Sequence, residues 1–325
     1  MGQLIRATVT RRLAGAWLLA LVGMGLAAPY LPLPFSPVVP DLLCISVSPG
    51  QGAAAGHWLG TDPLGRDVLA NLLFGARTVL LLTVPAALLT AVLGAVLGSM
   101  MGYGERAGRV PAPVWLLGAG LAWWGLALPR PGLGLAGCAV AGAWALGLQL
   151  MRRAFPRWSL PLDALLLGAG ALLGTVPRLL LAAAVAARGP LSLGNLLALL
   201  VLTSWPGPAR LVRAETLRAR ALPFVEAARA MGLPTCRIWL RYVLPQALRP
   251  LRTDLPLSLA TLLGLESTLS FLGLGFPPEV ASWGHLLAAA RLDTGAWWVV
   301  VFPVAALLLT TAALHTLARQ QSRAL

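Results

Sequence analysis

The chain contains no lysine, and charged residues of either sign make up only 11% of its 325 residues. A soluble domain of this size carries about a quarter charged residues, so the composition excludes a soluble globular domain. The lysine-containing phosphate loop of many ATPases is also excluded. Any ATP hydrolysis linked to this protein must therefore come from another chain, with ATP and magnesium bound there.

Cysteine and histidine are also scarce. The cysteines show neither metal-ligand spacing nor a disulfide framework, and no nucleophile motif accompanies the histidines, which lie far apart. The residues concerned are Cys44, Cys138 and Cys236, and His57, His285 and His315. We expect no catalytic residue, no metal site and no cofactor in this chain, which argues against an intramembrane enzyme.

Apolar residues are abundant instead, at 58% of the chain. Several apolar runs reach the roughly 20 residues that cross a bilayer as a helix, so we predict an all-α membrane protein. Eight spans are expected, at about 13–29, 77–103, 110–128, 132–150, 160–187, 191–209, 255–275 and 296–317. The first could be a secretory signal, but its apolar character continues through residues 30–33, so we interpret it as an uncleaved span.

The arginines predict the orientation of these spans. A net charge of +14 could indicate nucleic-acid binding, but the arginines are spread among loops between apolar runs. With a cytoplasmic N-terminus and eight alternating spans, 19 arginines face the cytoplasm and five face outward, while Arg178 lies within a span. This is the positive-inside distribution, so both termini are predicted to be cytoplasmic and no nucleic-acid partner is expected.

The most arginine-rich connection runs from residue 210 to 252 and contains nine arginines. Apolar residues recur in it at helical spacing, in two sets: Phe224, Ala227, Ala228 and Met231, then Cys236, Trp239, Leu240 and Val243. Gly232 suits the end of a first helix, where we expect it in left-handed backbone conformation, and Pro234 suits the first turn of a second. Pro245 should stop that second helix. The pattern predicts two short amphipathic helices with an elbow, and an interfacial helix pair on lipid is the alternative.

The order of residues in this loop resembles the EAA loop of ABC-importer permeases. Glu226-Ala227-Ala228 is followed by Gly232 and, after nine intervening residues, by Tyr242-Val243-Leu244-Pro245. The resemblance implies a cytoplasmic coupling element that docks into a groove of a separate ATPase subunit. The residues implied in coupling are Glu226, Ala227, Ala228, Gly232, Leu244 and Pro245.

Three further stretches, residues 57–67, 205–213 and 266–284, resemble segments of dipeptide, oligopeptide and nickel permeases. In the first, we expect Thr61 and Asp62 to cap a helix starting at Pro63. A catalytic role for its two carboxylates beside His57 is the weaker alternative.

Together the motifs resemble the second permease subunit of a peptide/nickel-type ABC importer. This implies a type I importer bundle, here a six-span pattern with an inserted hairpin at 110–150, in the bacterial inner membrane. The implied partners are a homologous permease, ABC ATPase subunits, an external substrate-binding protein and membrane lipid. Di- or oligopeptides are the implied cargo, with nickel or a metal chelate as the alternative. Residues 1–73 would form the first span and its external loop, and residues 74–325 the permease domain.

Two ionisable residues within the predicted spans are candidates for the translocation pathway. An unpaired Arg178 at mid-span would cost at least about 2.5 kcal/mol, so it should be hydrated or paired, with Glu266 as the acidic candidate. A secondary transporter is the other class of function to consider. It would show paired intramembrane charges and an inverted repeat, but the sequence shows only these two residues and no repeat.

Overall fold

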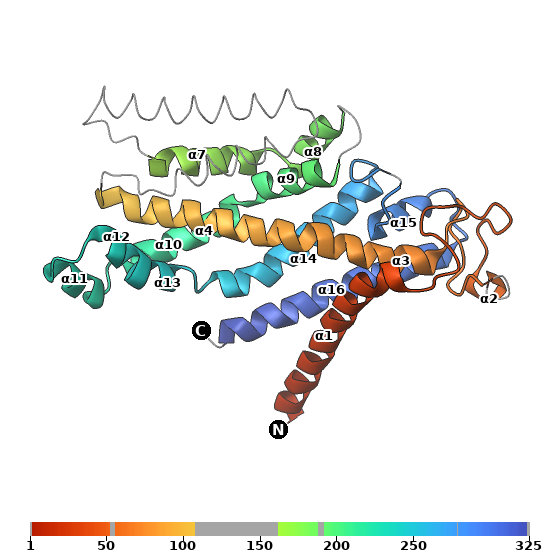
Figure 1. The fold of residues 1–325 in the computed structure, drawn as a ribbon, viewed down its shortest axis with the longest axis horizontal. Coiled ribbons are helices and arrows are strands. Elements are labelled where there is room, and N and C mark those ends of the chain that lie inside the picture. The colour runs from red at the N-terminus through yellow and green to blue at the C-terminus, as the bar shows by residue number, and fades with distance from the viewer. Residues whose placement is uncertain (1, 53–55, 108–161, 188–191, 278, 324–325) are drawn as a thin grey trace. The chain divides into compact units, whose positions relative to one another are not determined.

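A computed structural model describes residues 2–52, 56–107, 162–187, 192–277 and 279–323 (Figure 1). In this part of the chain the regular structure is helical, and one isolated bridge joins Thr61 to Asp67. An all-α fold is confirmed for these residues, whereas the hairpin expected at 110–150 lies outside them. The α-helices are α1 (Gly2–Ala27), α2 (Pro49–Gly52), α3 (Val68–Thr78), α4 (Val84–Ala107), α7 (Leu162–Thr175), α8 (Arg178–Ala186), α9 (Leu193–Ser204), α10 (Pro206–Ala219), α11 (Pro223–Ala230), α12 (Thr235–Ile238), α13 (Leu244–Ala247), α14 (Leu251–Phe271), α15 (Trp283–Ala289) and α16 (Trp297–Arg323).

Three helical stretches of the described residues are long and apolar enough to cross a membrane: Thr10–Tyr30, Val68–Tyr103 and Trp297–Ser322. A fourth candidate span is broken, because α7 and α8 meet at an angle of 80°. The sequence predicts one continuous span here. Pro177 explains the break, because proline disfavours helical backbone at Val176 and has no N–H to donate.

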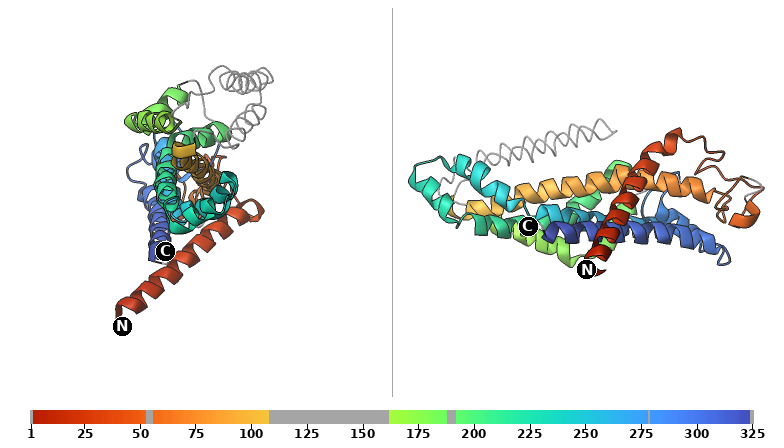
Figure 2. Two further views of the ribbon diagram at one scale, coloured as in Figure 1. Left: turned by 90° about the vertical axis from the view of Figure 1, so that its left-hand side faces the viewer. Right: turned by 90° about the horizontal axis from the view of Figure 1, so that it is seen from below.

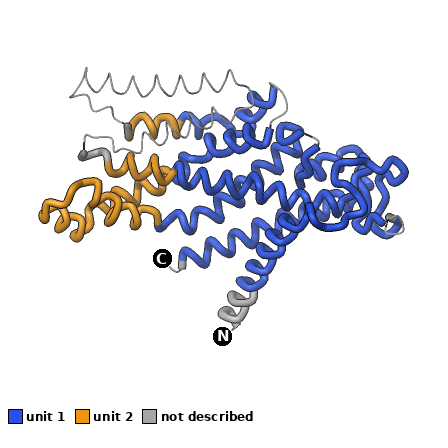
Figure 3. The backbone as a smooth tube through the Cα atoms, in the orientation of Figure 1, with its two compact units in different colours: residues 1–93, 172–208, 249–325 blue, residues 94–171, 209–248 orange. Residues whose placement is uncertain are grey.

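The described chain divides into two compact units (Figure 3). The first comprises residues 1–93, 172–208 and 249–325. Within it α14 packs against α15 and α16, and α1 crosses α16 and contacts α3 (Figure 2). Leucines at buried positions of three segments form part of one core cluster of this unit: Leu82, Leu196, Leu200, Leu262 and Leu269.

The second unit comprises residues 94–171 and 209–248. In it the end of α4 lies directly against α10, because Gly98 and Gly102 present no side chain. A Cβ atom at Gly102 would lie 2.6 Å from Cβ of Thr216, well inside van der Waals contact. Gly98 and Gly102, four residues apart on α4, therefore allow the two helices to pack closely.

Two π-helical segments each lead into a helix with proline in its first turn. Val79–Thr83 leads into Val84-Pro85, and Trp239–Val243 leads into Leu244-Pro245. The N–H of Leu244 bonds the carbonyl of Trp239, five residues back, in place of the residue four back. This wider turn leaves room for the Pro245 ring, which would clash with the preceding turn of an α-helix. The prediction that Pro245 stops the second helix is therefore wrong, because Pro245 lies in the first turn of α13.

Candidate functional site

The arginine-rich loop folds as the elbow that the sequence predicts. Helix α11 begins with Pro223 in its first turn and ends at Ala230, and Gly232 follows with φ +75°. The N–H of Gly232 bonds the carbonyl of Arg229 at 2.9 Å, and the N–H of Leu233 bonds that of Ala228 at 3.3 Å. These two bonds form a Schellman cap, which needs a left-handed residue at this position. The prediction of a left-handed glycine at the elbow is confirmed.

One face of the elbow is buried within its own unit. Val225 and Ala228 of α11 pack with residues of the following helix and with the end of α4, in a cluster of Tyr103, Ala219, Val225, Ala228, Ile238, Trp239 and Val243. Two polar contacts add to this cluster. The Tyr103 hydroxyl donates to the Thr235 carbonyl at 3.2 Å, and Arg220 donates to the Gly102 carbonyl at 2.7 Å. The two helices are therefore held as one rigid piece.

The opposite face of the elbow is exposed and apolar. Phe224 is 42% exposed, Met231 71% and Leu240 51%. Glu226 and Ala227 are exposed as well, and so are arginines 229, 237 and 241 on the same pair of helices. Of the first apolar set that the spacing identified, only Ala228 is buried. The buried partner that sequence reasoning missed is Val225, which stands three residues before it.

The polar segment before α3 caps that helix, but with a different residue from the one predicted. Asp67 is the N-cap and accepts from the Ala70 N–H at 2.7 Å. Asp62 instead closes a turn by accepting from the N–H groups of Leu64 and Arg66. The predicted helix start at Pro63 is wrong, because Asp62 forms this turn and leaves α3 to begin at Val68. Burial raises the pKa of Asp62, against the opposing effect of these two hydrogen bonds.

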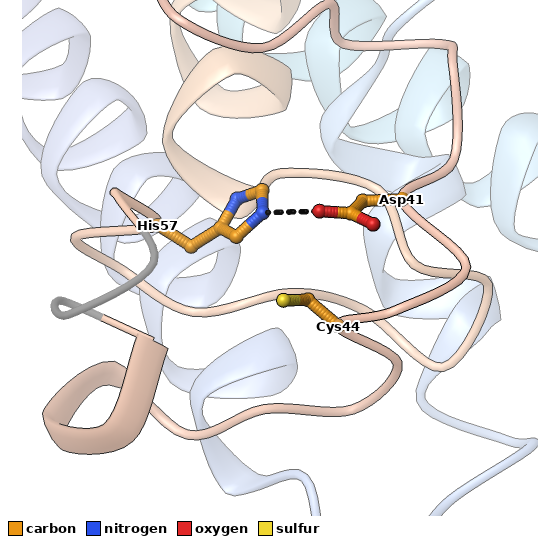
Figure 4. A group of neighbouring side chains, drawn as sticks. All are labelled: Asp41, Cys44 and His57. Atoms are coloured by element: carbon orange, nitrogen blue, oxygen red, sulfur yellow. Dashed lines mark hydrogen bonds and ion pairs between the residues drawn. The ribbon is translucent and has the colours of Figure 1, made fainter.

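In the same segment the side chains of Asp41 and Cys44 lie beside that of His57, more than ten residues further along the chain (Figure 4). His57 is fully buried and stacks on Phe35, with the ring centroids 3.7 Å apart. Its Nδ1 lies 3.0 Å from Asp67 and its Nε2 3.4 Å from Asp41. The sulfur of Cys44 joins Asp41 and His57, and the ligand atoms of the three lie within 4.8 Å of one another. No spacing in the sequence indicated this cluster.

The motif around Trp283 joins α15 to two other helices of the first unit, and Glu266 is buried on one of them, α14. The Glu266 carboxylate accepts from Ser270 at 2.9 Å and from Ser267 at 3.3 Å. A Cβ atom at Gly284 would lie 2.6 Å from Cβ of Ser270, so α15 can approach α14 here only because of the glycine. The Trp283 indole donates to the Leu72 carbonyl of α3 at 3.0 Å.

Comparison with known proteins decides the family. The family model for the binding-protein-dependent transport system inner membrane component matches residues 154–324. The chain belongs to this family. It is therefore a multi-pass inner-membrane permease subunit of an ABC importer. Family membership also confirms that catalysis and cofactor binding are not expected of this subunit, and it implies an ATPase and a binding protein as partners.

Individual relatives of the permease carry more specific names. A putative peptide transport system permease protein of Brucella suis is 32% identical over 261 residues, which cover 80% of this chain and 69% of the relative. A putative peptide permease protein of the same organism is 30% identical over 288 residues, covering 87% and 76%. The dipeptide transport system permease protein DppC of Bacillus subtilis is 29% identical over 267 residues, covering 81% and 66%.

The permease does not pair its two intramembrane ionisable residues in the part of the chain that the structure describes. Arg178 is the exposed first residue of α8, directly after the bend at Pro177, whereas Glu266 is buried and hydrogen-bonded to serines. Among the described residues, Arg213 and Asp163 form a well-aligned ion pair instead. Arg213 donates to both carboxylate oxygens of Asp163, at 2.6 and 2.5 Å, a bidentate pair that sequence reasoning missed.

Proposed function

We propose that the permease moves di- or oligopeptides inward across the bacterial cytoplasmic membrane, and that the elbow at residues 223–247 transmits the motion of a separate ATPase. The geometry of the elbow carries this proposal. A buried face fixes the helix pair as a rigid body, while an exposed apolar face bordered by arginines offers a docking surface. Such a pair can transmit a push, which a flexible loop cannot do.

The residues of the EAA-like motif take distinct places in this mechanism. Glu226 and Ala227 lie on the exposed face and would contact the ATPase groove, whereas Ala228 anchors the helix from its buried side. Gly232 sets the angle between the two helices. Leu244 and Pro245 begin α13, which would carry the displacement toward the membrane.

The names of the three relatives described above support peptides as cargo, since they refer to peptide or dipeptide permeases. Nickel or a metal chelate is the alternative that the sequence motifs leave open. The assembly we propose contains this permease, a homologous second permease, ATPase subunits, an external binding protein and the surrounding lipid. ATP-driven closure of the ATPases would switch the spans between outward-open and inward-open states.

The cargo is tested in proteoliposomes that contain the assembled importer and its binding protein. We expect ATP-dependent uptake of labelled di- and oligopeptides, competed by unlabelled peptide and not by nickel. Uptake of nickel alone would replace the peptide proposal with the metal alternative.

The same assay tests Arg178 as a residue of the translocation pathway. Arg178→Leu should lower uptake and Arg178→Lys should retain it, because a cation exposed beside apolar helices needs water or a partner. Wild-type uptake by Arg178→Leu would remove Arg178 from the pathway.

We further propose eight spans with both termini in the cytoplasm, in which the hairpin at 110–150 lies outside the translocation path. Residues 1–73 would form the first span and external loop, and residues 74–325 the permease domain. Each hairpin arm has about 19 residues, or roughly 28 Å as a helix, which matches a bilayer core. The turn at residues 129–131 would then face outward.

This topology predicts that a cysteine placed at Arg130 reacts with a membrane-impermeant thiol reagent added from outside. The background for the experiment replaces the three native cysteines with serine, and a cysteine at Arg237 in the elbow serves as the cytoplasmic control. We expect external labelling at position 130 and none at position 237 until the membrane is opened. Labelling at 130 from the cytoplasmic side alone would contradict the eight-span arrangement.

A further inference from the structure

The external loop before α3 gathers an aspartate, a cysteine and a histidine whose ligand atoms face one another (Figure 4). His57 is completely buried, whereas Asp41 keeps 28% of its side chain exposed and Cys44 is partly exposed. The group is therefore closed on the protein side and open toward solvent. An ion could enter from the solvent side without any rearrangement of α3.

His57 is oriented as a metal-binding histidine is. Its Nδ1 lies 3.0 Å from the Asp67 carboxylate, which also caps α3 and is therefore fixed. A carboxylate that accepts from Nδ1–H places the lone pair of the ring on Nε2, and protein metal sites use this arrangement to orient a histidine ligand. Stacking on Phe35 holds the ring in its plane. Nε2, the nitrogen that would bind the ion, lies against the carboxylate of Asp41.

The spacing within the group fits tetrahedral coordination. Two ligand atoms about 2.0–2.1 Å from a zinc ion lie about 3.4 Å apart. The carboxylate oxygen of Asp41 and Nε2 of His57 are 3.4 Å apart. A nitrogen and a thiolate sulfur around the same ion lie about 3.5 Å apart. Since all the ligand atoms already lie within 4.8 Å of one another, Cys44 needs to shift its sulfur by about 1 Å.

We propose that Asp41, Cys44 and His57 bind one divalent transition-metal ion, with zinc as the expected metal and solvent in the fourth position. Mixed oxygen, nitrogen and sulfur ligands are typical of zinc. Binding would release the thiol proton of Cys44, which otherwise stays on the sulfur because burial and the neighbouring Asp41 raise the pKa of Cys44. The site does not depend on which cargo the permease carries.

The ion would fasten the external loop to the permease core. Asp41 and Cys44 lie in the middle of the loop, whereas His57 is bonded to Asp67, the N-cap residue of α3. Backbone and side-chain hydrogen bonds already attach the loop, among them one from the Asp41 N–H to the Gly65 carbonyl and one from the Asn71 side chain to the Pro37 carbonyl. Zinc would add a further tie, which joins the side chains of Asp41 and Cys44 to that of His57.

The proposal is tested by titrating zinc into the full-length permease, purified with its partner subunits and freed of metal. Cys44→Ser and Asp41→Asn each remove one ligand, and Cys236→Ser is the matched control because Cys236 is an exposed cysteine in the elbow. We expect one zinc ion more per permease in the wild type and in Cys236→Ser than in Cys44→Ser. We also expect each ligand variant to weaken zinc binding by at least about tenfold.

Cobalt provides a second readout, because a thiolate bound to cobalt gives an ultraviolet charge-transfer band that a structural change elsewhere cannot produce. The band should be present in the wild type and in Cys236→Ser and absent from Cys44→Ser. Zinc should also raise the unfolding temperature of the wild type more than that of Asp41→Asn. Equal zinc stoichiometry in the wild type and Cys44→Ser, or a cobalt band that survives in Cys44→Ser, would overturn the proposal.

Discussion

Replacing Gly232 by valine is expected to abolish substrate-stimulated ATP hydrolysis in the reconstituted importer, while the permease still inserts and assembles. Gly232 has φ +75°, and no atom lies within 4 Å of the position of its missing Cβ. The obstacle to valine is therefore conformational, since left-handed backbone costs a side chain with a branched Cβ about 1–2 kcal/mol or more. The chain would relieve this strain by opening the cap at Leu233, which would change the angle of the elbow.

Asparagine at the same position is the matched control. It tolerates left-handed backbone better than other residues with a side chain, so Gly232→Asn should keep most of the stimulated ATPase activity. Loss of activity in both variants would show that side-chain volume at the docking surface matters more than backbone conformation. Full activity in Gly232→Val would contradict the assignment of the elbow as the coupling element.

Charge reversal at the exposed face tests the docking surface without touching the backbone. Glu226 lies in the first turn of α11, where a negative charge favours the helix and where we place the ATPase contact. We expect Glu226→Lys to abolish stimulated ATP hydrolysis as well. Glu279→Lys makes the same change at another exposed glutamate outside the elbow, and it should leave stimulation intact.

The second large effect is expected from Gly102→Val, which should destabilise the packing of α4 on α10. A Cβ atom there would lie 2.6 Å from Cβ of Thr216 and 2.9 Å from the Arg213 carbonyl, so the two helices would have to separate. Overpacking of this kind costs about 1–3 kcal/mol, and more where backbone is the obstacle. Thermal unfolding in detergent should show a clearly lower midpoint and a reduced yield of folded permease.

Gly264→Val controls for the substitution itself. Gly264 lies in the interior of α14, and no atom lies within 4 Å of a Cβ at that position. The Gly264→Val permease should therefore unfold at a temperature close to the wild-type midpoint. An equal loss in both variants would mean that valine in a helix, and not the contact with Thr216, causes the instability.

The sequence alone predicted the helical class, the family motifs and the elbow with its left-handed Gly232. These features are local, because the apolar period, a missing N–H or a missing Cβ acts within a few residues of its own position. Local pattern also misled in two places. It predicted that a helix ends at Pro245, whereas a π-helical turn accommodates the proline ring and the helix continues. It also predicted Thr61 and Asp62 as helix caps, whereas Asp67 is the N-cap of α3.

Tertiary structure alone decided which side chains meet across long stretches of chain. Asp41 and His57 are 16 residues apart and Arg213 and Asp163 are 50 apart, yet each pair is in contact. No periodicity encodes such meetings, because they depend on how whole helices and loops pack. The same holds for the two faces of the elbow. Helical spacing marked both Ala227 and Ala228 as apolar, and only packing against Tyr103 and Trp239 buried Ala228 and left Ala227 exposed.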